Sequence, residues 1–109
     1  MNDLAGSRCV PCEGGVPSLD RANAEAQLRA LNSAWILAAD NKSLSRSFAF
    51  RDFYRTMSFV NALAHIANTE DHHPDLGVGY GYCHVTFSTH AIGGLSENDF
   101  ICAAKLDRL

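Results

Sequence analysis

Two adjacent histidines are the residues of this sequence best suited to chemistry. The segment Glu70-Asp71-His72-His73-Pro74 places two imidazoles next to each other, directly after two carboxylates. Neighbouring side chains point in different directions in a helix or a strand, and Pro74 disfavours a helical conformation at His73. We therefore expect the pair at the end of a regular element, where it suits a site better than a core.

A third histidine, His90, lies eighteen residues beyond His72, at the far end of an expected hairpin. A strand of about eight residues spans roughly 26 Å, and a tight hairpin returns its end close to its start. His72, His73 and His90 are therefore expected to converge at one end of a sheet. Glu70 and Asp71 would lie beside them, where a carboxylate can orient an imidazole or raise its pKa.

Two kinds of chemistry fit three histidines. Imidazole titrates near neutrality, so such a site suits a reaction that needs an acid at one atom and a base at another. Three histidines also suit zinc with one open position, although adjacent histidines chelate less commonly than spacings that share a helix face. The residues alone favour proton transfer and leave a metal site open.

The four cysteines, Cys9, Cys12, Cys83 and Cys102, do not form a recognisable framework. Cys9 and Cys12 have the CxxC spacing of metal and redox sites, but they lie in a leader with glycines and prolines and no preceding strand. We interpret residues 1–18 as an irregular, chemically quiet arm before a single domain, 19–109. A zinc-binding module that uses these cysteines and the histidines remains an alternative.

Composition excludes several classes of function. The chain has 109 residues, 47% of them hydrophobic, and a formal charge of −3. A net negative charge argues against nucleic acid as the main ligand. No apolar run approaches the roughly 20 residues that span a bilayer, and the N-terminus lacks the pattern of a signal peptide. We therefore expect a cytoplasmic protein without a membrane segment.

Hydrophobic periodicity predicts two hairpins, each followed by a helix. Asp20, Asp52 and Ser96 are expected helix N-caps, and Gly81-Tyr82 is the expected turn of the second hairpin. Gly77 and Gly79 leave one face of a strand without side chains, which often marks a close approach by a ligand or another backbone. The fold expected is α+β, a four-stranded antiparallel sheet with three helices on one face. The expected elements are helix 21–31, strands 35–39 and 44–50, helix 53–69, strands 76–80 and 83–90, and helix 97–108.

Four motifs, in order and spacing, resemble those of the pterin-4a-carbinolamine dehydratases. The resemblance covers about residues 20–108, and the leader 9–17 also looks like that of bacterial members. The His-His-Pro motif alone is weak, but its separation from a Ser/Thr-Thr-His and a following Gly-Leu-Ser/Thr is specific. The motifs are Phe50-Arg51-Asp52-Phe53, His72-His73-Pro74, Ser88-Thr89-His90 and Gly94-Leu95-Ser96-Glu97-Asn98-Asp99-Phe100.

The resemblance implies a hydro-lyase that expels water from a 4a-hydroxytetrahydropterin to give the quinonoid dihydropterin. It would recycle the cofactor of aromatic amino acid hydroxylases. It implies catalysis by His72, His73 and His90, with no metal and no separate cofactor, because the pterin is the substrate. We expect His72 and His90 to transfer protons and His73 to help bind. The residues expected to bind the substrate are Pro74, Asp71, Glu70, Trp35 and Thr89.

The chain departs from the family pattern at two polar positions. Many members carry an acidic residue where this chain has Asn68, and an arginine is common where it has Asn98. We expect Glu70 or Asp71 to take over the orienting role that Asn68 lacks.

The resemblance also implies partners. It predicts a homo-oligomer, a dimer or a tetramer, that serves an aromatic amino acid hydroxylase. Because some relatives act as dimerisation cofactors for a transcription factor, a protein-binding module with little enzyme activity is the alternative. Its surface would be the broad apolar stripe of helix 53–69.

Overall fold

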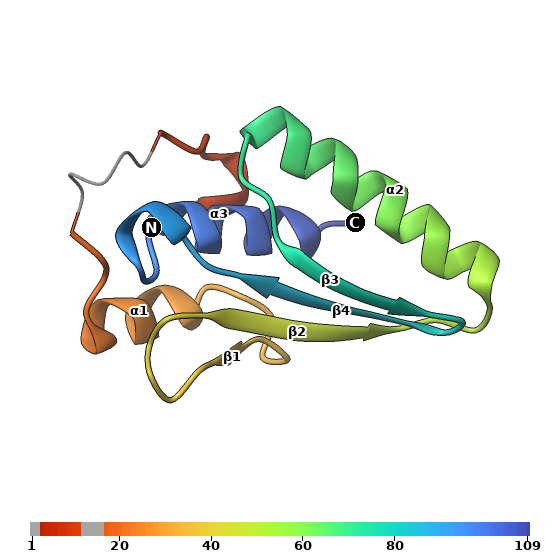
Figure 1. The fold of residues 1–109 in the computed structure, drawn as a ribbon, viewed down its shortest axis with the longest axis horizontal. Helices are drawn as coiled ribbons and strands as arrows, with labels where there is room; N and C mark the ends of the chain where they lie inside the picture. The colour runs from red at the N-terminus through yellow and green to blue at the C-terminus, as the bar shows by residue number, and fades with distance from the viewer. Residues whose placement is uncertain (1–2, 12–16) are drawn as a thin grey trace.

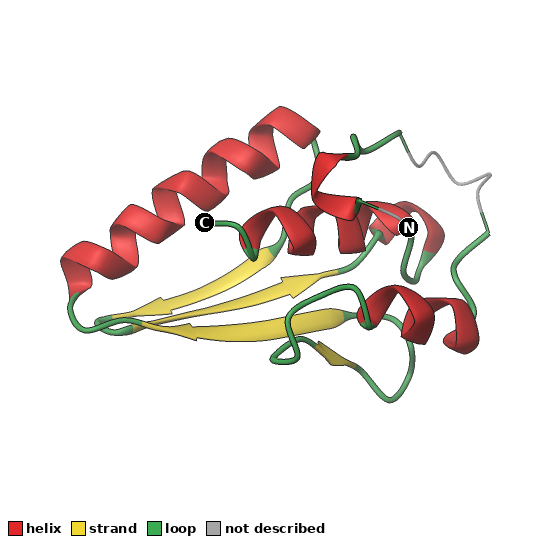
Figure 2. Ribbon diagram, turned by 180° about the vertical axis from the view of Figure 1, so that it is seen from behind, coloured by secondary structure: helices red, strands yellow, loops and turns green. Residues whose placement is uncertain are grey.

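The computed structural model describes residues 3–11 and 17–109, and it confirms the predicted α+β architecture (Figure 1). A four-stranded antiparallel sheet forms one layer and helices form the other (Figure 2). The helices are α1 (Arg21–Leu28), α2 (Phe53–Glu70) and α3 (Glu97–Leu106), with short 3-10 turns η1 (Leu4–Gly6) and η2 (His90–Ile92). The strands are β1 (Ile36–Leu37), β2 (Leu44–Ala49), β3 (Asp75–Gly79) and β4 (Tyr82–Phe87).

Strand β4 lies inside the sheet, whose order is β1-β2-β4-β3. Its register pairs Val85 with Arg46 on one side and with Leu76 on the other. Because side chains alternate along a strand, Cys83, Val85 and Phe87 face the helices and are buried, while His84 faces solvent. This alternation of buried and exposed residues was predicted. Strand β4 runs from the turn of the hairpin back toward the start of β3.

The turn of this hairpin consists of Tyr80 and Gly81, so the prediction of a turn that begins with the glycine was wrong by one residue. Gly81 is needed because a Cβ there would come within 2.9 Å of the carbonyl oxygen of Phe50. A Cβ at Gly79 would meet the ring of Tyr82 at 2.1 Å. The glycine-bare face therefore accommodates the chain's own Tyr82 ring, on the side of the sheet away from the helices.

Helix caps follow the sequence closely. Asp20 accepts from the amide of Asn23 at 2.8 Å and Asp52 accepts from the amide of Arg55 at 2.8 Å. Helix α1 ends three residues earlier than predicted, and the helix expected at 97–108 ends at Leu106. In α3, eight of ten residues are buried, because the helix packs against the sheet, α2 and η1.

The described residues 3–11 of the N-terminal arm contact α3. Leu4 is buried in the core, and the ammonium of Lys105 donates to the carbonyl of Ala5 at 2.8 Å. Arg108 donates to the carboxylate of Asp3 at 3.0 Å. Residues 3–11 are thus held to the domain by the buried side chain of Leu4 and by polar contacts of Ala5 and Asp3 with α3 and the residues after it.

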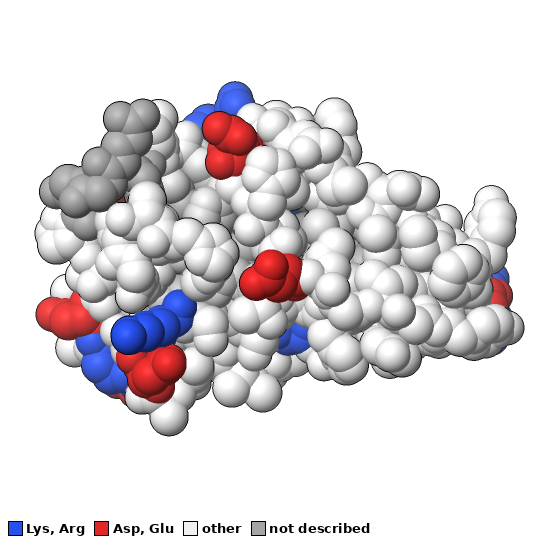
Figure 3. Space-filling model, viewed as in Figure 1, with Lys and Arg blue, Asp and Glu red and all other residues white. Residues whose placement is uncertain are grey.

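Two findings bear on classes of partner. Among the described residues, no helix is both long enough and apolar enough to span a membrane. The face of the molecule in Figure 3 carries scattered acidic and basic side chains and no cluster of lysine and arginine.

Trp35 belongs to the core under the sheet. It is 3% exposed, packs edge-on against Phe48 at 6.1 Å and donates from its indole to Asp107 at 2.7 Å. The same carboxylate accepts from Arg46 at 2.6 Å and from the amide of Asn32 at 2.9 Å. Asp107 thus joins the end of α3 to β2 and to the segment before β1.

We predict that Trp35→Phe lowers the free energy of unfolding by about 1–2 kcal/mol, because it removes the indole donor and part of the buried ring. Urea unfolding measures the change. The control is Tyr82→Phe, which removes an exposed hydroxyl and should change stability by less than about 0.5 kcal/mol. Equal stability of the two variants would contradict the core role of Trp35.

Candidate functional site

The end of helix α2 positions the two adjacent histidines. Asp71 has φ of 51°, a left-handed conformation that a residue other than glycine adopts rarely. The amide of His72 then donates to the carbonyl of Ala67 at 3.1 Å, and the amide of Asp71 donates to Asn68 at 3.4 Å. These two bonds are the Schellman pattern of a helix end. The helix therefore stops abruptly, and the histidines follow in the turn beyond it.

The hairpin brings the third histidine to the same place. Asp75 pairs with Thr86, so the chain that leaves β4 after Phe87 returns to the level at which β3 begins. His90 lies at the start of η2, and all three histidines line one pocket of about 490 Å³. Their predicted convergence is confirmed. The pocket is lined by residues 9–11, 70–73, 88–91 and Asn98.

A second hollow of about 610 Å³ lies where η1 meets the end of α3. It contains no histidine, and its charged lining residues already pair with one another or with the core. Arg108 pairs with Asp3, and Asp107 holds Arg46 and Trp35. The smaller pocket, with its three imidazoles, is therefore the better candidate for chemistry.

His72 is held firmly between a carboxylate and a ring. Its Nε2 lies 2.6 Å from Oδ1 of Asp99, a side chain with 0% exposure, and its ring stacks on Phe87 at 6.0 Å. Oδ2 of Asp99 accepts from the hydroxyl of Thr89 at 2.8 Å and from the amide of Ser96 at 3.0 Å. An ionised carboxylate can only accept, so against ionised Asp99 the hydrogen lies on Nε2 of His72, and Nδ1 is the nitrogen that remains for a ligand.

Sequence reasoning missed this role of Asp99. It assigned the orientation of an imidazole to Glu70 or Asp71, whereas the structure places Asp99 against His72. Asp99 was recognised only as the third residue of α3 in a capping box, which the structure confirms. The Ser-x-x-Asp spacing of Ser96 and Asp99 was the available signal. A carboxylate that caps a helix with one oxygen has its second oxygen left to bind an imidazole.

His73 and His90 are more exposed than His72. Nε2 of His73 lies 3.1 Å from Oδ1 of Asn68, so Asn68 itself contacts the imidazole beside it. Asp71 is exposed at the rim of the pocket. The site therefore contains one fixed imidazole and two that a ligand can reach readily.

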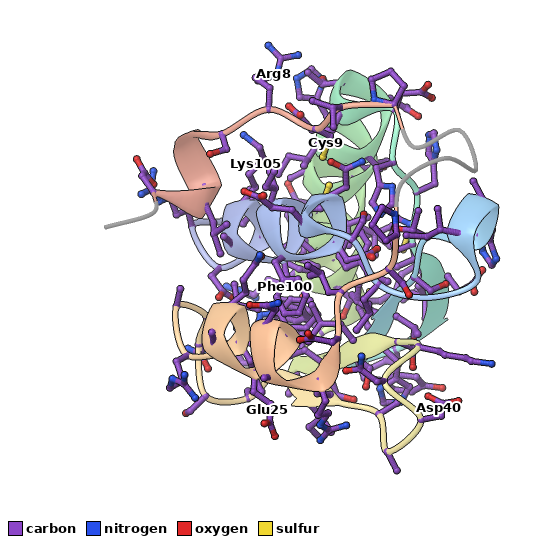
Figure 4. The ribbon with its side chains drawn as sticks, turned by 90° about the vertical axis from the view of Figure 1, so that its left-hand side faces the viewer. Arg8, Cys9, Glu25, Asp40, Phe100 and Lys105 are labelled. Carbon is purple, nitrogen blue, oxygen red and sulfur yellow. The ribbon has the colours of Figure 1, made fainter. Side chains whose placement is uncertain are left out.

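Glu70 anchors the N-terminal arm. Its side chain is 5% exposed, accepts from the amide of Cys9 at 2.8 Å and pairs with Arg8 at 3.0 Å. Lys105 lies 3.9 Å from the same carboxylate, and Figure 4 shows Arg8, Cys9 and Lys105 on the same side of α3, above it in this view. Burial alone would raise the pKa of Glu70, but the amide of Cys9 and the charges of Lys105 and Arg8 outweigh it and lower the pKa.

The thiol of Cys9 lies 3.6 Å from that of Cys102. The Cys102 thiol is buried and contacts Cys9. The contact and the burial raise the pKa of the Cys102 thiol far above its usual range, so this thiol stays protonated. Cys12 lies outside the described residues. In the described part of the chain, no three His, Cys, Asp or Glu side chains are grouped so as to hold a metal ion.

The comparisons with known proteins bear on this pocket. The family model described as Pterin 4 alpha carbinolamine dehydratase matches residues 17–109. The chain belongs to the pterin-4-alpha-carbinolamine dehydratase family. A relative from Nitrosomonas europaea, named "Putative pterin-4-alpha-carbinolamine dehydratase", is 59% identical over 98% of this chain and 93% of its own. A relative of the same name from Legionella pneumophila (strain Lens) is 53% identical over 99% of this chain and 96% of its own.

Two solved structures share the fold. A transcriptional coactivator/pterin dehydratase from Brucella melitensis has a TM-score of 0.79 and 32% identity, covering 84% of this chain and 96% of its own. A pterin dehydratase-like protein identified as a RuBisCO assembly factor has a TM-score of 0.60 and 25% identity, covering 69% of this chain and 87% of its own. The dehydratase fold is thus found in proteins that are described with different activities.

The structure separates the expected substrate-binding residues of this pterin dehydratase family member into two groups. Glu70, Asp71 and Thr89 line the pocket with the three histidines. Trp35 and Pro74 are not among its lining residues, and Trp35 lies in the core instead. A lone tryptophan beside an apolar run gave no signal to distinguish a pocket wall from a core residue.

We predict that Glu70→Gln lowers the free energy of unfolding by about 1–2 kcal/mol at pH 7, because it removes a buried charge-assisted contact. The lowered pKa means that this stabilisation is complete above the ordinary value near 4.5 and is lost as pH falls through the lower, folded-state value. Urea unfolding at pH 7, 5 and 3 should show the gap between wild type and variant closing.

The control for this change is Glu25→Gln, which removes one partner of an exposed pair with Arg21 on α1. It should alter stability by less than about 0.5 kcal/mol at each pH. A gap between wild type and Glu70→Gln that stays constant from pH 7 to pH 3 would contradict the stabilising role of the Glu70 charge.

Proposed function

We propose that this protein dehydrates 4a-hydroxytetrahydropterin to the quinonoid dihydropterin and so recycles the cofactor of aromatic amino acid hydroxylases. The observation that carries the proposal is the meeting of His72, His73 and His90 in one pocket. Membership in the pterin-4-alpha-carbinolamine dehydratase family supports it. The product and water account for every atom of the substrate, so the reaction needs no further reactant.

The chemistry requires two proton transfers at neighbouring atoms of the pterin ring. An acid protonates the hydroxyl group as its bond to the ring carbon breaks, and water leaves. A base takes the proton from the adjacent ring nitrogen, whose electrons form the new double bond. Imidazole, with an unperturbed pKa near 6.5, can serve either purpose at neutral pH.

The environments of the histidines suggest how they divide this work. We assign proton transfer to His72 and His90, and binding to His73 beside Asn68. His72 is the better oriented of the first two, because Asp99 fixes its Nε2 and Phe87 fixes its plane. Among the carboxylates that line the pocket, Asp71 is the more accessible to the amino and amide donors of a pterin ring. Glu70 and Thr89 instead hold the pocket's own residues, Cys9 and Asp99.

The central test is the dehydration of 4a-hydroxytetrahydropterin, generated in solution and followed by its ultraviolet spectrum. The wild type should accelerate the spontaneous reaction, while His72→Ala and His90→Ala should each lose about 10²-fold in rate, the usual contribution of a general acid or base. His84→Ala is the matched control, because His84 is exposed on the other face of the sheet and bonds to Ser47. Full activity in both site variants would refute the assignment.

A second prediction concerns Asp99. Asp99→Asn should lower kcat by about tenfold, because an uncharged amide orients and stabilises the His72 imidazole less well. Ser96→Ala is the control for the helix cap, since it removes a partner of Thr89 and leaves the contact of His72 with Asp99 in place. It should lower the free energy of unfolding by about 1 kcal/mol and leave kcat within about twofold. Similar losses of kcat in the two variants would point to damage of the helix end instead.

A protein-binding module is the second candidate function. The similar protein from Brucella melitensis is described as a transcriptional coactivator/pterin dehydratase, and the other structural neighbour as a RuBisCO assembly factor. At the start of α2, Phe53 and Tyr54 are exposed, and Phe53 stacks on Tyr80 at 6.5 Å. If the wild type does not accelerate dehydration, this aromatic surface becomes the leading site of function. For either function we propose a cytoplasmic homo-oligomer.

A further inference from the structure

The N-terminal arm forms one wall of the histidine pocket. Cys9, Val10 and Pro11 line it together with the end of α2 and the segment after β4. The imidazoles come from the latter two segments, whereas the arm and Asn98 of α3 line the pocket without contributing a histidine. Its contribution to the proposed activity is therefore separate from proton transfer.

Asn98 holds this wall in place with two hydrogen bonds. Its Oδ1 accepts from the amide of Val10 at 3.0 Å, and its Nδ2 donates to the carbonyl of Val10 at 2.6 Å. Asn98 is 4% exposed, and its side chain pairs with the amide and the carbonyl of Val10 as the backbone of a neighbouring strand would. An amide is suited to this because it can donate and accept at once, whereas an arginine can only donate.

The arm and the His72 imidazole lie on two walls of the pocket, and two adjacent residues of α3 hold them. Asn98 holds Val10, and the next residue on α3, Asp99, holds His72. On the other side, Glu70 holds the amide of Cys9 and lies two residues before His72. The spacing between the arm and the fixed imidazole is thus set by the first turn of α3 and the last residue of α2.

The surface that the arm offers to a ligand is apolar. Val10 is 63% exposed, Pro11 has no amide hydrogen, and the amide and carbonyl of Val10 are engaged by Asn98. A planar heteroaromatic ring needs apolar contact with its faces and polar partners at its edge. The arm suits the first of these needs and the histidines suit the second.

We propose that Val10 and Pro11 contact the bound pterin and set its affinity, with Asn98 as the positioning residue that holds them. This inference rests on the proposed function. It assigns to the arm a part in KM and in the dissociation constant, and it leaves kcat to the histidines.

The test compares three variants in the dehydration assay and in fluorescence binding of a stable probe, 7,8-dihydrobiopterin. In Asn98→Ala, KM and the dissociation constant should rise about five- to tenfold, the equivalent of about one hydrogen bond of ordinary strength, with kcat within about twofold. Val10→Ala, which keeps the arm docked, should raise both by about two- to threefold. Arg108→Ala breaks an exposed contact of the arm outside the pocket and should change neither.

Each outcome decides between the two proposals. A wild type that neither accelerates dehydration nor binds the probe overturns the proposed function and this inference with it. An active wild type whose KM and dissociation constant are unchanged in both Asn98→Ala and Val10→Ala overturns the inference alone. A loss of kcat at constant KM in Asn98→Ala would also overturn it, because the residue would then act through Asp99 and His72. Val10→Ala remains decisive if Asn98→Ala fails to fold.

Discussion

The site depends on the hydrogen bonds that the buried carboxylate of Asp99 accepts. This carboxylate accepts from the amide of Ser96, which starts α3, from the hydroxyl of Thr89, which follows β4, and from the imidazole of His72, which follows α2. A carboxylate without solvent exposure is costly unless each of its oxygens is hydrogen-bonded. The fold meets this requirement only when the three segments meet at one point. The same arrangement that makes the burial tolerable therefore assembles the pocket.

A second constraint acts on the backbone. Helix α2 must end so that His72 reaches Asp99 while His73 stays beside Asn68. The left-handed conformation of Asp71 turns the chain within one residue, and this is a conformation that only glycine adopts without cost. Asp71 is also an exposed carboxylate at the pocket rim. Glycine at this position would relieve the backbone but would remove this charge from the pocket rim.

Much of the fold was predictable because its signals are local. Caps at Asp20, Asp52 and Ser96, and the alternation along β4, each depend on residues close in sequence. The meeting of His72 with His90 was also predictable, since a tight hairpin returns the chain by geometry alone. The contacts of Asp99 with the ring of His72 and of Glu70 with the amide of Cys9 were not. They join residues 27 and 61 positions apart, respectively, and the burial of the two carboxylates is known only after packing.

The contacts of residues 9–11 show what composition alone does not indicate. Glycines and prolines correctly argued against regular structure near Cys9, but irregular backbone can still be fixed when its amides find partners elsewhere. Here Glu70 supplies one partner and Asn98 another. Glu70 lies next to Asp71 and Asn98 lies next to Asp99, so the arm and the imidazole of His72 are held by the same two helix ends.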